Sequence, residues 1–226
     1  MKYHVGLQGR EHTPIDKARG SIIGCRDSGL VEIGSAFDAV VQQGDTFAVV
    51  IRIDDNLEEY LQVTKLGQSL QVGLDPDRLL GLGNGTLEAE ITMPALSGIE
   101  ASGASQVTLS GFDSSQTLRV VASGASSVEG DIRAGDVSIE ASGARSISLA
   151  GGAGDLVLDV SGASSADLEE FPVSNILADL SGASSAVVNA SGTLDVEASG
   201  ASELSYLGNP TLGSVDTSGA STVREK

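Results

Sequence analysis

The chain has 226 residues, 40% of them apolar, so it is long enough to bury a sizeable core. Its 31 acidic and 13 basic side chains give a formal net charge of −18, which disfavours binding to nucleic acid or anionic lipid, because both need a positive surface. One cysteine excludes an internal disulfide, and the two histidines, His4 and His12, both lie near the N-terminus, which excludes most general-base and zinc chemistry from the rest of the chain.

Residues 1–26 differ in composition from the rest of the chain. They contain five basic and two acidic side chains, a net charge of +3. We expect an N-terminal arm that is poorly ordered, either a leader or the remnant of a trimmed precursor, with a basic strap on the acidic body as the alternative. The arm lacks the apolar core of a signal peptide, and no segment of the chain approaches the roughly 20 apolar residues of a transmembrane helix.

Residues 27–96 are predicted to be a β-rich N-terminal part. Apolar runs at 37–41, 47–53 and 70–74 are typical of strands, and glycines at 44, 67 and 85 indicate turns between them. Residues 54–61 are expected to form a helical turn. Because no linker rich in proline, glycine or serine follows, residues 27–226 are predicted to be a single composite domain.

Residues 97–226 contain a repeated Ser-Gly-Ala motif. Its seven copies begin at Ser102, Ser123, Ser142, Ser161, Ser181, Ser199 and Ser218, at intervals of 18 to 21 residues. The fourth residue is serine in every copy except the third, where it is Arg145. A period near 20 residues with glycine at a fixed place is typical of a solenoid in which each repeat is one coil.

The residues around the motif indicate strands rather than helices. The third residue before each copy is apolar: Ile99, Val120, Ile139, Leu158, Ala178, Val196 and Val215. Most residues immediately before the motif are also apolar, and this spacing by two is the alternation of a strand. A repeat of about 19 residues is too short for a strand, a useful helix and two turns. We therefore predict an all-β fold, a parallel β-helix with about 19-residue coils, right-handed like nearly all parallel crossovers.

The motif itself is predicted to be the corner between two strands, because glycine adopts a positive φ at little steric cost. Strict alternation would place the fourth residue of the motif toward the core, whereas a bend at glycine would place the alanine there. We expect the alanines to pack inward, namely Ala104, Ala125, Ala144, Ala163, Ala183, Ala201 and Ala220.

An acidic residue lies two positions before the motif in six of the seven copies: Glu100, Glu140, Asp159, Asp179, Glu197 and Asp216. Val121 occupies the position in the remaining copy. Alternation points these side chains outward, so stacked coils would align them in a column about 4.8 Å apart. The column is either a solvated face or a site for a divalent cation such as calcium or for a cationic ligand. Glycoside hydrolysis would also need a groove between two carboxylates, which the sequence does not indicate.

These features together resemble the bacterial auto-transporter adhesin head (GIN) domain family over residues 25–224. The segments that carry the resemblance are the seven motif copies and residues 34–37, 43–45, 54–57, 91–96 and 206–210. The resemblance implies a right-handed parallel β-helix that is exported to the periplasm, outer membrane or cell surface, usually behind a signal sequence. It implies no catalytic residues for this chain.

The expected function is that of a non-enzymatic, adhesin-like module, exported or on the cell surface, which binds a glycan or a surface protein through its repetitive polar face. No cofactor other than the calcium considered above is expected. One alternative is an enzyme that acts on polysaccharide, because parallel β-helices host such enzymes. The other is a structural unit that assembles into homo-oligomers through the solenoid ends.

Overall fold

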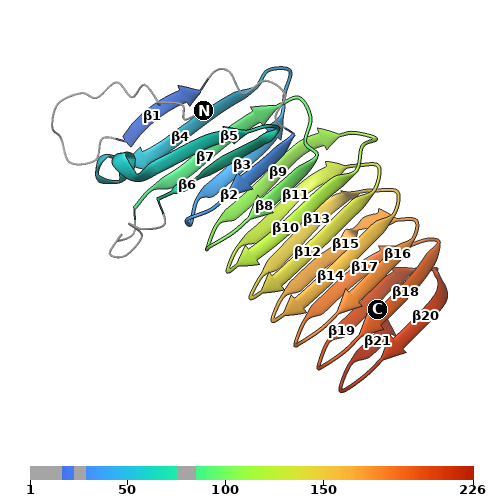
Figure 1. Cartoon of the computed structure of the whole chain (residues 1–226). Helices are drawn as coiled ribbons and strands as arrows, with labels where there is room; N and C mark the ends of the chain where they lie inside the picture. The colour runs from blue at the N-terminus through green and yellow to red at the C-terminus, as the bar shows by residue number, and fades with distance from the viewer. Residues whose placement is uncertain (1–16, 23–28, 76–84) are drawn as a thin grey trace.

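The computed structural model describes residues 17–22, 29–75 and 85–226, and its chain is nearly all β, with 67% strand and 3% helix. The chain winds into a solenoid of stacked coils whose strands form two sheets (Figure 1). The all-β solenoid with coils of about 19 residues is thereby confirmed. His4, His12 and Cys25 lie outside the described residues. So does most of the predicted arm, except for residues 17–22, which form strand β1.

Within the described residues, one sheet has ten strands and the other eleven. Sheet A contains, in spatial order, β20 (Thr211–Thr217), β18 (Thr193–Ala198), β16 (Ile176–Leu180), β14 (Leu156–Gly162), β12 (Val137–Gly143), β10 (Leu118–Gly124), β8 (Gly98–Ala101), β2 (Leu30–Ile33), β6 (Ser69–Leu74) and β5 (Leu61–Leu66). Sheet B contains β1 (Lys17–Ile22), β4 (Ala48–Asp54), β7 (Leu87–Met93), β3 (Asp38–Gln43), β9 (Gln106–Asp113), β11 (Ser127–Arg133), β13 (Ser146–Gly152), β15 (Ser165–Val173), β17 (Ser185–Ala190), β19 (Glu203–Gly208) and β21 (Thr222–Glu225).

Each Ser-Gly-Ala repeat forms one coil, with one strand in each sheet. The coils run from β8 and β9 to β20 and β21, and consecutive coils pair in parallel. Corresponding motif residues pair directly, as Ser123 does with Ser142 and Gly124 with Gly143. Equivalent side chains therefore lie above one another along the solenoid axis, as the repeat predicted.

The N-terminal part extends both sheets with a different chain path. β2 and β3 form a coil that pairs in parallel with β8 and β9. The chain then departs into β4, a 3-10 helix η1 (Asp55–Tyr60), β5, β6 and β7 before it returns at β8. β6 and β7 continue the parallel pairing on the other side of β2 and β3, whereas β5, β4 and β1 are added antiparallel.

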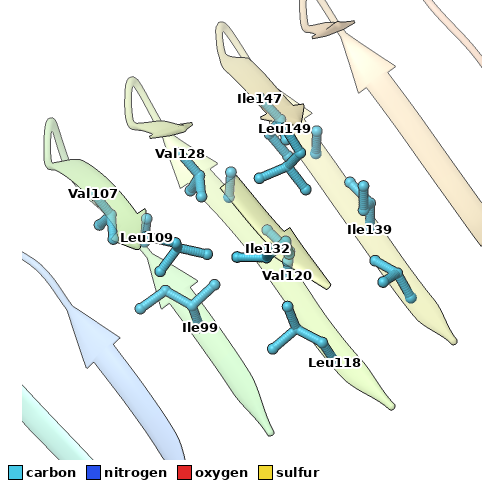
Figure 2. Close-up of a cluster of buried hydrophobic side chains, with 14 of the residues drawn as sticks. Ile99, Val107, Leu109, Leu118, Val120, Val128, Ile132, Ile139, Ile147 and Leu149 are labelled. Carbon is cyan, nitrogen blue, oxygen red and sulfur yellow. The ribbon is translucent and has the colours of Figure 1, made fainter. Parts of the chain in front are cut away.

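The core consists of aliphatic side chains stacked in columns. Val120 lies between Ile99 and Ile139 in sheet A, and Val128 lies between Val107 and Ile147 in sheet B (Figure 2). All six side chains are 0–1% exposed. Because each coil presents the same few positions to a narrow interior, small branched side chains fill it, which explains the aromatic content of only 3%.

The corner prediction is confirmed, but the side chain predicted to face inward was wrong. The motif glycines have positive φ, for example +73° at Gly103 and +77° at Gly162. Ala104 and its equivalents are exposed, whereas the fourth residue of the motif is buried in six of the seven copies, as Ser105 is at 1% exposure. The alternation of inward and outward side chains therefore continues from one strand to the next through the corner. The buried hydroxyl is satisfied locally, because Ser105 Oγ donates to the carbonyl of Ser102 at 2.8 Å, so burial of this polar group costs little.

Arg145 replaces the buried serine of the third repeat and is itself 6% exposed. Its guanidinium donates to the backbone carbonyls of Ser142, Ala122 and Gly124, while its Nε has no partner among the described residues. Burial lowers the pKa of Arg145. Arg145 thus donates to the carbonyl of Ser142, as Ser105 does to that of Ser102. Unlike serine, it also places a positive charge in the interior.

A second set of side chains caps the turns that lead from sheet B to sheet A. Asp136 Oδ1 accepts from the N–H of Asp155, Asp155 Oδ1 accepts from the N–H of Asn175, and Asn175 Oδ1 accepts from the N–H of Thr193, at 2.9–3.2 Å. Each of these side chains binds the backbone of the next coil. The turns are therefore held in the same stacked arrangement as the glycine corners.

Candidate functional site

The acidic residues singled out from the sequence form one column on the outer face of sheet A. Strand pairing joins Glu140 to Asp159, Asp159 to Asp179, Asp179 to Glu197 and Glu197 to Asp216. Glu100 pairs with Val121, which in turn pairs with Glu140. We call this set of residues the acidic column. The four residues of its C-terminal half, Asp159, Asp179, Glu197 and Asp216, are all exposed.

The column begins one coil earlier than the sequence indicated, at Glu32. Glu32 pairs with Glu100, and its neighbours Val31 and Ile33 point inward. The first coil lacks a Ser-Gly-Ala motif and turns instead at Ser35 and Ala36, which have positive φ. The signal that could have found Glu32 is the alternation of Val31, Glu32 and Ile33, which repeats that of Ile99, Glu100 and Ala101.

The N-terminal half of the column is bound by neighbouring side chains. Glu32 accepts hydrogen bonds from Ser69 at 2.5 Å and from Gln71 at 2.7 Å. Arg119 lies on the same strand as Val121, and its guanidinium binds Glu100 at 2.8 Å and Glu140 at 3.0 Å. An arginine therefore bridges the two carboxylates on either side of the one coil that lacks an acid.

In the C-terminal half of the column, Asp216 accepts a hydrogen bond from the Ser214 hydroxyl at 3.0 Å. Asp159, Asp179, Glu197 and Asp216 form no ion pair with any residue that the structure describes. Two unit charges about 4.8 Å apart repel by about 1 kcal/mol in bulk water, and by more where solvent is displaced. Partial burial raises the pKa of Asp159, and the nearby carboxylates of Asp179 and Glu140 raise it further.

The residues on either side of the column add polar and apolar surface. Ser161 and Ser181 follow it toward the corner, and on the other side lie Val157 and Leu177, which pair with each other. These two apolar side chains are 50% and 56% exposed. The strands of sheet A from β8 to β20 contain no aromatic residue. The face thus offers carboxylates that have no ion-pair partner among the described residues, beside hydroxyls and a small apolar patch.

Sheet B presents a shallow groove of about 400 Å³ that the sequence did not indicate. Its acidic lining residues are Glu129, Asp131, Asp167, Glu169 and Glu170. The pairing of β15 with β17 shifts register between Asp167 and Pro172, so this segment departs from the repeat. Three of the carboxylates already have partners. Glu169 forms an ion pair with Lys226, Glu129 accepts a hydrogen bond from Thr108, and Asp167 accepts one from the N–H of Glu169.

Two further findings concern the described residues only. Across residues 17–22, 29–75 and 85–226, no group of three or more histidine, cysteine or acidic side chains is arranged to hold a metal ion. The same part of the chain contains no helix with the length and hydropathy needed to cross a membrane.

Comparison with known proteins identifies the family of the chain. Residues 30–210 match the family model described as "Putative auto-transporter adhesin, head GIN domain". No protein with a curated description matches the chain significantly.

Several solved structures share the fold. A "putative adhesin" from Bacteroides fragilis NCTC 9343 is 18% identical with a TM-score of 0.85, and the match covers 94% of this chain and 99% of that chain. A "putative adhesin" from Parabacteroides merdae ATCC 43184 is 18% identical with a TM-score of 0.67, covering 93% and 96%. A "putative lipid binding protein" from Parabacteroides distasonis ATCC 8503 is 17% identical with a TM-score of 0.68, covering 93% and 97%. At these identities the likeness shows the fold alone.

Proposed function

Because the chain belongs to the auto-transporter adhesin head (GIN) domain family, we propose that it is an exported or cell-surface, adhesin-like module that binds a cationic protein partner through the acidic column. Family membership supports the adhesin-like surface role. The observation that carries the binding proposal is the in-register half-column of four exposed carboxylates without ion-pair partners among the described residues. In this proposal the module acts by binding rather than by catalysis.

The geometry of the face favours lysine and arginine side chains as its ligands. The carboxylates follow one another at the coil spacing of about 4.8 Å, so their fields add along a line. Burial raises the pKa of Asp159 and repulsion from Asp179 and Glu140 raises it further, and a basic partner would relieve that repulsion. Val157 and Leu177 beside the line offer the apolar contact that protein interfaces bury at their centre.

The composition of the strands that carry the acidic column favours a protein partner over a glycan. The strands of sheet A from β8 to β20 contain no aromatic ring against which a sugar could stack. Neutral sugars also gain little from an uninterrupted row of negative charge, because they carry no cation to pair with it.

The proposal is tested by titrating the protein with a polylysine peptide and, separately, with a serine-glycine peptide of the same length. We expect only polylysine to bind. The triple variant Asp159→Asn, Asp179→Asn, Glu197→Gln should weaken that binding at least about tenfold, which corresponds to about 1.4 kcal/mol.

The matched control is the triple variant Glu129→Gln, Asp131→Asn, Asp167→Asn, which removes the same number of charges from sheet B. It should change the affinity less than about twofold, or about 0.4 kcal/mol. Equal losses in the two triple variants would show that only the net charge attracts the peptide and would contradict the proposal. Binding of glycans from a panel, with or without release of reducing ends, in preference to polylysine would contradict it as well.

A further inference from the structure

The C-terminal coil of the solenoid leaves core-facing side chains open to solvent. Leu212 and Val215 pair with Leu194 and Val196, which are 0% and 1% exposed. Leu212 and Val215 themselves are 48% and 37% exposed, because β20 has no neighbouring strand beyond it among the described residues. In sheet B, Val223 pairs with the fully buried Leu204 but is only partly buried. Core positions that earlier coils bury thus form an apolar surface at this end.

The same coil leaves two strand edges unpaired. Among the described strands, β20 is the last of sheet A and β21 the last of sheet B, and each pairs on one side only. The backbone N–H and C=O groups on their free sides are a template for another strand. Both edges lie in one coil, so a partner must present two strands at the separation of the two sheets.

The charge of this end differs from that of the rest of the molecule. Residues 211–226 contain two acidic side chains, Asp216 and Glu225, and two basic ones, Arg224 and Lys226, so they are neutral in sum. Residues 1–210 carry the whole formal charge of −18. Two copies of this strongly acidic chain therefore meet with the least repulsion at their C-terminal coils.

The opposite end of the solenoid is built differently. It carries η1, whose Leu57 is 3% exposed, and the antiparallel strands β5, β4 and β1. The two ends therefore differ in strand direction, and Figure 1 shows them at opposite extremes of the stack. This difference favours joining of like ends over stacking of unlike ends into a fibre.

We propose that the C-terminal coil is an association face for a second copy of this chain, joined end to end about a two-fold axis. A two-fold axis perpendicular to the sheets pairs β20 with β20 and β21 with β21 of the second copy, both antiparallel. A second copy necessarily presents two edges at the right separation, and it covers Leu212, Val215 and Val223 with the same side chains. This inference does not depend on the proposed function of the acidic column.

Sedimentation equilibrium of the full chain over roughly 1 to 300 µM, where weak dimers dissociate, tests the proposal. We expect the mass to rise from 22.8 kDa to twice that value and to stop there. The variants Leu212→Asp and Val215→Asp should remain monomeric across the range. The matched control is Leu177→Asp, which changes a more exposed leucine on the outer face of sheet A and should dimerise like the unaltered chain.

Hydrogen exchange on the unaltered protein provides a second measurement that does not depend on the folding of a variant. Backbone amides on the free edges of β20 and β21 should exchange more slowly at high protein concentration, while those of β12 should not change. A mass of 22.8 kDa at every concentration would overturn the proposal. So would growth beyond two copies, or edge amides whose exchange does not depend on concentration.

Discussion

The glycine corners show how a single residue type permits the coils to stack. Gly162 has φ +77°, and a Cβ there would lie 2.6 Å from the carbonyl oxygen of Gly143 in the coil before. The corner therefore needs glycine for two reasons, the backbone conformation and the close approach of the neighbouring coil.

The variant Gly162→Ala should lower the free energy of unfolding by at least about 3 kcal/mol, because the left-handed conformation alone costs about 1–2 kcal/mol and the coil must also be displaced. The control is Gly67→Ala, at φ +62° with no atom within 4 Å of the added Cβ, which should cost only the conformational part. Urea denaturation followed by circular dichroism measures both. An equal loss of unfolding free energy in the two variants would mean that contact between stacked corners does not contribute to stability.

At the scale of the sheet, the acidic column places like charges opposite one another on neighbouring strands. The folded environment raises the pKa of Asp159 above its unfolded value, so the folded state binds more protons than the unfolded state in that range. This contribution to stability is present at acidic pH and is lost as the pH rises through the raised pKa.

Replacement of Asp159 by asparagine should therefore stabilise the protein at neutral pH, by about 0.5 kcal/mol or about 1–2 °C in Tm. The gain should vanish in acid, where the aspartate is protonated. Thermal denaturation at the two pH values measures it. The control Glu129→Gln, whose cross-strand neighbours are Thr108 and Ser148, should give a smaller gain at neutral pH. A pH-independent gain for Asp159→Asn would point to packing instead.

The repeating elements were predictable from the sequence, and the exceptions were not. The constant spacing of the Ser-Gly-Ala copies predicted coils, strands, corners and the six carboxylates of the column, because stacking turns a sequence period into a spatial one. The inward alanine was a wrong prediction, since the bonding of Ser105 to its own turn cannot be read from hydrophobicity.

Non-repeating parts were harder to predict. Glu32 joins the column from a coil that is separated from β8 by the segment β4 to β7, so no periodicity connects it with Glu100. The ion pairs of Arg119 with Glu100 and Glu140 form because the arginine side chain is long enough to contact the coils on both sides of its own. The spacing of residues in the sequence does not predict this contact. The groove on sheet B arises where β15 departs from the repeat.

The molecule as a whole carries a net charge of −18. Like charges on a folded chain repel more than on the expanded unfolded chain, and salt screens this repulsion over a Debye length that falls from about 30 Å at 0.01 M to about 3 Å at 1 M.

We therefore expect Tm to rise by several degrees, roughly 3–6 °C, when NaCl is raised from about 0.01 M to 0.5 M, as measured by differential scanning calorimetry. The triple variant Asp159→Asn, Asp179→Asn, Glu197→Gln should show a smaller rise, because it lacks part of the repulsion. A Tm that is insensitive to salt in both proteins would show that the carboxylates are already compensated.

The detour of the chain between β3 and β8 bears on the order in which the molecule can assemble. β2 pairs with β6 on one side and β8 on the other, so a chain emerging N-terminus first completes neither neighbour of β2 until residues 69–74 and then 98–101 have been made. After that point each newly made repeat can pair its two strands with those of a coil that has already folded. Seven nearly identical repeats could pair with one another in several wrong registers. Because the strands of the N-terminal part differ from the repeats, they define a single place from which coils can add in the correct register.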